Sequence, residues 1–272
     1  MTAALLKRAI PRSLKPIIRR QLGLPKPYNP YIAASIEEQT VSFRWRGRLF
    51  TIKSDRTTPV YETIAEVVDY DCYQLTKVAW PETPGCIVDI GANIGIAAVV
   101  LSQLPCRRVV CFEPLPDNCA TLQSNIERNG IDNVTVVRAA ISDVVGRASF
   151  EVSPASVGGR LADGKNTQPD QRLISVDCLR LSDALALCGE QNVDLLKVDC
   201  EGGEYSIVGQ MTLETATRIA SLTFEVHDLD SRRNCRSLAA ALTKLGYDLQ
   251  FKPDIFGRSN LHHILAVRPR PR

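Results

Sequence analysis

The sequence predicts an α/β protein built on a doubly wound, mostly parallel β-sheet. Three observations carry this prediction. Short apolar runs, typical of buried strands, alternate with helical segments from residue 86 onward. The first of these runs, CIVDIG, ends in a glycine where a helix is expected to begin. Two strand-like segments follow the last predicted helix and indicate an antiparallel terminal pair.

The elements of this sheet follow one another at regular intervals. We expect strands at residues 86–91, 107–114, 133–142, 193–200 and 218–228. Helical spacing is found at residues 94–104, 117–130, 204–211 and 231–246. Asp117 is the expected N-cap of the second helix. Strands that alternate with helices in this way predict right-handed crossovers and a parallel sheet, which residues 247–252 and 262–269 close as the antiparallel pair.

The chain divides into three parts. Residues 1–40 form a basic arm and linker, a candidate for peripheral contact with an anionic membrane or for bridging the subunits of a homo-oligomer. Residues 41–80 predict a hairpin around Gly47 and a helix over 60–79, both packed on the core. Residues 81–272 form the main domain, with a polar loop insertion at about 153–171. The segments GRASFEVS and RLISVDCL, on either side of this loop, are expected to be strands.

Composition narrows the class of protein. The formal net charge of +3 over 272 residues is too small to predict a nucleic-acid partner. The nine cysteines include no C-x-x-C pair, which favours reduced thiols and a cytoplasmic location. No apolar stretch approaches the roughly twenty residues that a membrane-spanning helix needs.

The segment VDIGANIG predicts a cofactor-binding turn. Gly91, Asn93 and Gly95 follow the first central strand, where glycines let the backbone approach a ligand closely. The spacing is G-x-N-x-G and lacks the middle glycine of a dinucleotide turn, which argues against a nicotinamide-dependent oxidoreductase. Asp89 precedes the turn, where a carboxylate would repel a pyrophosphate but suits the ammonium group of S-adenosylmethionine, directly or through water.

The next two strands end in residues that fit the rest of this cofactor. Glu113 ends the second strand, where an acid accepts hydrogen bonds from ribose hydroxyls. The third strand ends in small residues, and we expect Ala140 to admit the flat adenine ring while Ser142 or Asp143 meets its amino group.

Charged side chains at the ends of the following two strands predict a catalytic site. Lys197, Asp199 and Glu201 share one side of the fourth strand and its turn, and Glu225 and His227 end the next strand. The carboxyl edge of an open parallel sheet is where ligands bind, so these side chains should face one pocket. Lys197 and Glu204 are equally well explained as ion-pair partners that order the turn.

Five blocks in the same order resemble the FkbM family of methyltransferases. They are VDIGANIG, CFEPLPDNCATLQSNIERNG, VRAAISDVVG, VDLLKVDCEGGEYSIVGQM and FEVHD. The resemblance covers residues 61–228 and implies a Rossmann-like, class I methyltransferase fold with S-adenosylmethionine as donor. It also implies O-methylation of sugars, polyketides or other secondary metabolites. We therefore expect the acceptor to be a hydroxyl on a sugar, glycolipid or secondary metabolite. Gly203 stands where the family more often has alanine.

Methylation of a hydroxyl requires a group that removes its proton. We expect His227 to be the general base, with Asp199 and Glu201 orienting the acceptor and the cofactor. In a rival model Asp199, Glu201, Glu225 or His227 holds a divalent cation, Mg²⁺ or Mn²⁺. The sequence also leaves open an N-methyltransferase and a cofactor-binding scaffold that does no chemistry. His262 and His263 are given no role.

Overall fold

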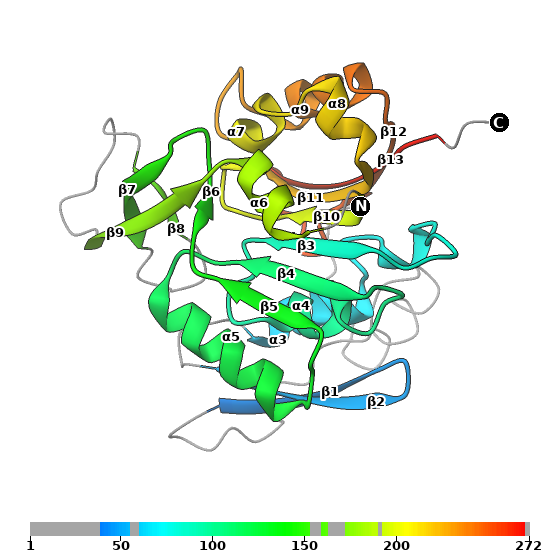
Figure 1. Cartoon of the computed structure of the whole chain (residues 1–272), viewed down its shortest axis with the longest axis vertical. Helices are drawn as coiled ribbons and strands as arrows, with labels where there is room; N and C mark the ends of the chain where they lie inside the picture. The colour runs from blue at the N-terminus through cyan, green and yellow to red at the C-terminus, as the bar shows by residue number, and fades with distance from the viewer. Residues whose placement is uncertain (1–38, 55–59, 153–158, 163–171, 190–191, 270–272) are drawn as a thin grey trace, which may run out of the picture.

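A central sheet with helices on both faces forms the core of the protein (Figure 1). The computed structural model describes residues 39–54, 60–152, 159–162, 172–189 and 192–269. Within them the sheet has the order β12 (Asp248–Pro253), β13 (Leu261–Val267), β11 (Ile219–His227), β10 (Val193–Val198), β3 (Cys86–Ile90), β4 (Arg108–Phe112), β5 (Val134–Val137). The strands from β11 to β5 are parallel, and β13 runs antiparallel to both β11 and β12. The predicted doubly wound, mostly parallel sheet is confirmed, with its antiparallel strand one position inside the edge.

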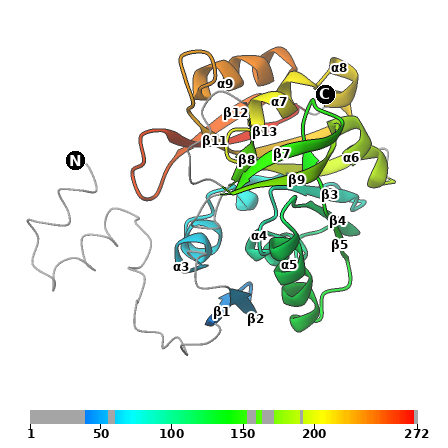
Figure 2. The same cartoon turned by 90° about the vertical axis from the view of Figure 1, so that its left-hand side faces the viewer.

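Two layers of helices sandwich this sheet (Figure 2). The first layer contains α3 (Val60–Ile64), α4 (Ile96–Leu101) and α5 (Pro116–Arg128). The second contains α6 (Leu181–Leu187), α7 (Glu204–Gly209), α8 (Leu213–Thr217) and α9 (Cys235–Lys244). Side chains alternate between the layers along each strand, so that Ile87 packs in the first cluster and Val88 in the second. Burial on both faces explains why the central strands are apolar throughout.

The N-terminal hairpin is confirmed and belongs to the main core. Strands β1 (Gln39–Trp45) and β2 (Arg48–Ser54) pair around Gly47, whose φ of 84° suits the tight turn. Asn125 of α5 and Asn129, the C-cap of this helix, accept hydrogen bonds from the β2 backbone, at 2.7 Å from Lys53 N and 2.8 Å from Thr51 N. These bonds cover the strand edge with a helix, and the inner face of the hairpin packs into the first layer.

The predicted helix over 60–79 is wrong in its extent. Helix α3 continues as a single π-helical turn, η1 (Ala65–Asp69), and a separate 3₁₀ turn follows, η2 (Leu75–Lys77). Asp71 and Gln74 lie between the two turns with φ of 52° and 53°, which an α-helix cannot contain. The Asp71 carboxylate accepts hydrogen bonds from the amides of Leu75 and Thr76 and so stabilises the break.

The strand predicted over 133–142 is two strands in different sheets. β5 ends at Val137, and β6 (Ala140–Ile141) joins a smaller sheet of order β6, β9 (Arg172–Leu179), β7 (Gly146–Val152), β8 (Gly159–Leu161). Where the chain crosses between the sheets, the carbonyl oxygen of Val137 accepts the amides of both Glu113 and Ala139. β7 and β9 match the strands expected on either side of the insertion. Of residues 153–171 the structure describes only 159–162, which contain β8.

Three further predictions concern a helix cap, the cysteines and contact with a membrane. Helix α5 begins at Pro116 with Leu115 as N-cap, so Asp117 lies in the first turn and is not the cap. All nine cysteines are free thiols, as expected. The basic arm of residues 1–38 lies outside the described residues, and none of the described helices is long and apolar enough to cross a membrane.

Candidate active site

A cavity of about 860 Å³ opens at the carboxyl ends of the central strands. It is centred where β3 and β10 lie side by side, the point at which strand order reverses and where open α/β sheets bind ligands. Gly91 follows β3, Glu113 follows β4, Asp199 follows β10 and His227 ends β11, and all four line the cavity. The topology therefore brings together side chains that are far apart in the sequence.

The glycine turn after β3 has the shape that its sequence predicts. Gly91 has φ of 78°, and a Cβ there would lie 1.7 Å from the carbonyl oxygen of Asp199. Gly95 has φ of 92°, and a Cβ there would lie 2.2 Å from Leu122 Cδ1. Only glycine fits either position. Gly91 and Asn93 line the cavity, whereas Gly95 serves the contact between the turn and α5.

Glu113 is held in place as an acceptor of hydrogen bonds. Its Oε2 accepts the amide of Asn93 at 2.9 Å, and its Oε1 accepts the amide of Leu115 at 3.0 Å and Asn118 Nδ2 at 3.2 Å. Burial raises the pKa of this carboxyl, while these donors act to lower it. The glycine turn itself thus fixes the carboxylate. Asn118, which supports Glu113 from α5, carried no signal in the sequence.

Strand β6 and the residues directly after it border the cavity. Ala140, Ser142 and Asp143 all line it. Asp143 Oδ1 accepts the hydroxyl of Ser206 at 2.9 Å, and this bond lowers the pKa of Asp143. Asp143 is therefore an ionised acceptor tied to α7.

Asp89 does not lie in the cavity wall. Its side chain is fully buried beneath the glycine turn, where Oδ1 lies 2.8 Å from Lys197 Nζ. The same ammonium group donates to the carbonyl oxygen of Gly91 at 3.0 Å. The carboxylate is on the buried face because strand alternation turns it toward the first helix layer. The expected contact of Asp89 with the cofactor is thus replaced by an ion pair that supports the turn from below.

Asp199 is anchored by a residue that the sequence did not single out. The hydroxyl of Tyr73 donates to Asp199 Oδ2 at 2.6 Å, and Lys197 Nζ lies 3.8 Å from the same oxygen. Burial, together with the charge of Asp199, raises the pKa of Tyr73 well above its ordinary value. Tyr73 therefore stays a donor and fixes the orientation of this carboxylate.

His227 lies among three carboxylates. Its Nδ1 is 2.9 Å from Glu204 Oε1, and its Nε2 is 3.3 Å from Glu201 Oε2 and 3.7 Å from Glu225 Oε1. Burial lowers the pKa of His227, but the hydrogen bond to Glu204 and the nearby negative charges outweigh it and raise the pKa to about 10. Nδ1 is thus committed to Glu204, and Nε2 faces the cavity.

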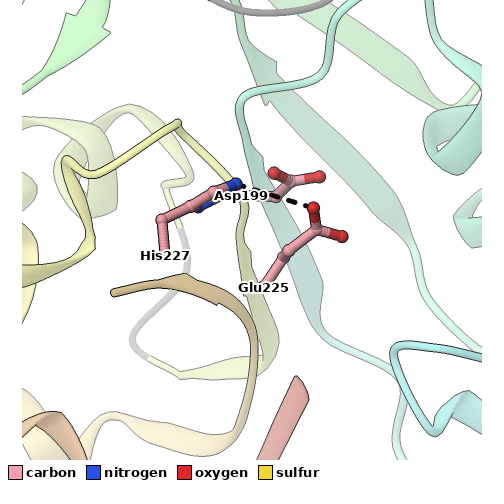
Figure 3. Close-up of side chains that lie close together, drawn as sticks. All are labelled: Asp199, Glu225 and His227. Carbon is pink, nitrogen blue, oxygen red and sulfur yellow. Dashed lines mark ion pairs between the residues drawn. The ribbon is translucent and has the colours of Figure 1, made fainter. Parts of the chain in front are cut away.

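Three of these side chains are close enough to share an ion. One ligand atom each from Asp199, Glu225 and His227 lies within 4.8 Å of the others (Figure 3). Burial raises the pKa of Glu225 well above its ordinary value, and neighbouring negative charges raise it further. Glu201, also expected as a ligand, is not a member of this set. A carboxylate–imidazole set of this kind suits Mg²⁺ or Mn²⁺.

The sequence matches the model of the methyltransferase FkbM domain over residues 89–252. This chain belongs to the FkbM methyltransferase family. The 2-O-methyltransferase NoeI of Sinorhizobium fredii is 31% identical over 159 residues, which are 53% of this chain and 64% of that protein. The 31-O-demethyl-FK506 methyltransferase FkbM of Streptomyces tacrolimicus is 27% identical over 215 residues, 68% of this chain and 82% of that protein. The crystal structure of methyltransferase FkbM from Methylobacillus flagellatus KT aligns with a TM-score of 0.45 and 15% identity, covering 78% of this chain and 55% of that one.

The family resemblance expected from the five sequence blocks is therefore confirmed. Of the residues predicted to form the site, the cavity brings together Gly91, Asn93, Glu113, Ala140, Asp143, Asp199, Glu201, Glu225 and His227. Asp89 and Gly95 lie behind it. His262 pairs with Asp228 at 3.1 Å, and His263 is fully buried on the inner strand β13.

Proposed function

We propose that this protein transfers the methyl group of S-adenosylmethionine to a hydroxyl of a sugar, glycolipid or secondary metabolite. The observation that carries the proposal is the Glu113 carboxylate, which the amide of Asn93 in the glycine turn holds at the edge of the cavity. A carboxylate in this place accepts hydrogen bonds from both hydroxyls of a ribose. Two curated relatives whose names describe O-methyl transfer support the choice of a hydroxyl acceptor.

The donor would lie along the glycine turn. In this arrangement Gly91 and Asn93 present backbone to the amino-acid end, Glu113 binds the ribose, and Ala140 with Asp143 receives the adenine. Asp89 acts indirectly. Its carboxylate forms an ion pair with Lys197, whose ammonium group donates a hydrogen bond to the carbonyl oxygen of Gly91. Because these backbone groups are already in place when the donor binds, they position it without any rearrangement of the protein during the reaction.

The transfer is an in-line displacement. S-adenosylmethionine would supply the methyl group to the acceptor oxygen and would leave as S-adenosylhomocysteine, which would keep the electron pair of the broken bond from carbon to sulfur. The hydroxyl proton passes to Nε2 of His227 in its neutral form, while Glu204 holds Nδ1. Asp199, held by Tyr73, and Glu201 orient the acceptor and the cofactor.

A divalent cation on Asp199, Glu225 and His227 is the second mechanism that the geometry supports. Such an ion would acidify the bound hydroxyl and so supply the chemistry otherwise expected of His227. The two mechanisms predict opposite responses to chelation. Activity that survives exhaustive treatment with EDTA favours the histidine base, and activity restored only by Mg²⁺ or Mn²⁺ favours the ion.

The function is tested by mass spectrometry of a metabolite and glycan extract incubated with the protein and a methyl-labelled donor. We expect label in products that gain one methyl group at an oxygen. His227→Ala should abolish the label while leaving the affinity for S-adenosylhomocysteine within about threefold. Label on nitrogen would indicate an N-methyltransferase. Donor binding without any labelled product across extracts would favour a scaffold that does no chemistry.

A further inference from the structure

Two large apolar side chains stand exposed at the edge of the cavity. Leu229, after β11, is 39% exposed, and Phe256, between β12 and β13, is 45% exposed. Both line the cavity. An exposed apolar pair is unremarkable on an open surface, but one that borders a ligand cavity marks a contact for an apolar group.

Each of these side chains lies in its own hydrogen-bonded turn. In the first turn, the amide of Leu229 donates to the carbonyl oxygen of Arg233 at 2.8 Å, and Arg233 Nε donates to Asp230 Oδ2 at 2.8 Å. The Asp230 carboxylate also accepts the amide of Arg233 at 2.7 Å. The turn that carries Leu229 is therefore closed by both backbone and side-chain bonds.

The second turn repeats this construction. The amide and Nε of Arg258 donate to Asp254 at 2.8 and 3.0 Å, and the guanidinium group lies 5.3 Å from the ring centroid of Phe256. Arg258 also pairs with Glu66 of η1, which ties the turn to the first helix layer. In Figure 2 the segment between β12 and β13 projects from the sheet toward α3. Phe256 is thus presented from a braced turn.

Leu229 is close to the reacting groups. A Cβ on Gly202 would lie 3.0 Å from Leu229 Cδ1, so Leu229 rests on the turn that carries Glu201. Glu201 in turn lies 3.3 Å from His227 Nε2. Leu229 therefore adjoins the polar interior of the cavity, and Phe256 lines the same cavity.

From this arrangement we infer that Leu229 and Phe256 form an acceptor subsite for an apolar substituent. The proposal rests on the proposed function and narrows it. The methylated hydroxyl belongs to an amphipathic molecule, whose hydroxylated part enters among Asp199, Glu201 and Glu225. The hydrocarbon part of the same molecule packs on Leu229 and Phe256. These two residues set acceptor specificity and take no part in donor binding.

The test compares hexyl β-D-glucopyranoside with methyl β-D-glucopyranoside by calorimetry, on protein saturated with S-adenosylhomocysteine. Each fully buried methylene tightens binding by up to about fourfold, so we expect the hexyl glucoside to bind at least about tenfold more tightly. Leu229→Ser and Phe256→Ser should each reduce this ratio to below about threefold. Their affinity for S-adenosylhomocysteine should stay within about twofold of the wild type.

The chain offers matched controls. Leu213 and Phe251 are more exposed, at 63% and 58%, and do not line the cavity. Leu213→Ser and Phe251→Ser should keep the full preference for the hexyl glucoside. Equal affinity of the two glucosides for the wild type, or an equal loss in the control variants, would overturn the subsite. Failure to bind S-adenosylhomocysteine would instead contradict the proposed function, and the two glucosides could then be compared on the free protein.

Discussion

Nδ1 of His227 lies 2.9 Å from Oε1 of Glu204, and the Glu204 side chain is completely buried. The same oxygen accepts the amide of Gly202 at 3.1 Å. One carboxylate thus fixes both the turn after β10 and the imidazole at the end of β11. It also contributes to the raised pKa of about 10 at His227.

Removing the charge of Glu204 should lower the pKa of His227. Glu204→Gln keeps an oxygen for the Gly202 amide but loses the negative charge, so the imidazolium is no longer stabilised by it. We expect a fall of at least about one unit, measured by NMR titration of the His227 ring. Asp228→Asn is a suitable control, because Asp228 pairs with His262. An unchanged titration in Glu204→Gln would show that Glu204 does not hold the proton on His227.

The rate of methyl transfer should rise with pH if His227 is the base. Only the neutral imidazole accepts a proton, and with a pKa of about 10 this form is scarce at pH 7. We therefore expect kcat/KM to increase about tenfold per pH unit from pH 7 to 9 and to level off near pH 10. A rate that is flat over this range without added metal would exclude His227 as the proton acceptor.

Removing only one of the two charges in the buried pair of Lys197 and Asp89 should strongly destabilise the protein. Lys197→Met leaves a fully buried carboxylate without its ion-pair partner, and we expect a loss of about 3–5 kcal/mol in the free energy of unfolding. Asp89→Asn combined with Lys197→Met removes both charges and should recover part of that loss. Urea denaturation of the two variants measures this. A double variant no more stable than Lys197→Met would contradict the coupling.

His263 should make stability depend on pH. Burial lowers its pKa from 6.5 to about 4, and neither ring nitrogen has a hydrogen bond among the described residues. Between these two values the unfolded chain binds the proton and the folded chain does not. The effect of His263 on the free energy of unfolding is therefore absent above pH 6.5. As the pH falls toward 4, protonation of the unfolded chain lowers this free energy by on the order of 3 kcal/mol.

This dependence can be isolated by comparison with His263→Phe, which cannot titrate at that position. The free energy of unfolding of the wild type should fall more steeply than that of the variant between pH 6.5 and 4. Urea denaturation at several pH values measures both slopes. Parallel curves would show that His263 does not titrate on unfolding.

The sheet and the glycine turn could be predicted from sequence because their signals are local. An apolar run marks each central strand, and Gly91 and Glu113 mark the ends of two of them. The break of the helix at Asp71 escaped prediction because the left-handed residues that cause it show no periodicity. The crossing between sheets after Val137 depends on pairing with β9, which lies far along the chain.

Of the site residues, only those at or near the ends of strands could be predicted from the sequence. Alternation correctly placed Lys197 and Asp199 on one side, but it does not say which carboxylate a buried ammonium group will take, and Lys197 takes Asp89. Tyr73 contacts Asp199 across 126 residues of sequence, and Phe256 reaches the cavity from a turn with no recognisable motif. Such contacts follow from tertiary packing, which local patterns do not encode.

The central claim is that the turn at Gly91 and the carboxylate of Glu113 bind S-adenosylmethionine. Calorimetric titration of S-adenosylhomocysteine into the wild type, Glu113→Ala and the exposed control Glu127→Ala tests it directly. We expect one site per chain, an affinity in Glu113→Ala weaker by at least about tenfold from lost charged hydrogen bonds, and no change in Glu127→Ala. No binding to the wild type, or equal binding to Glu113→Ala, would contradict the account.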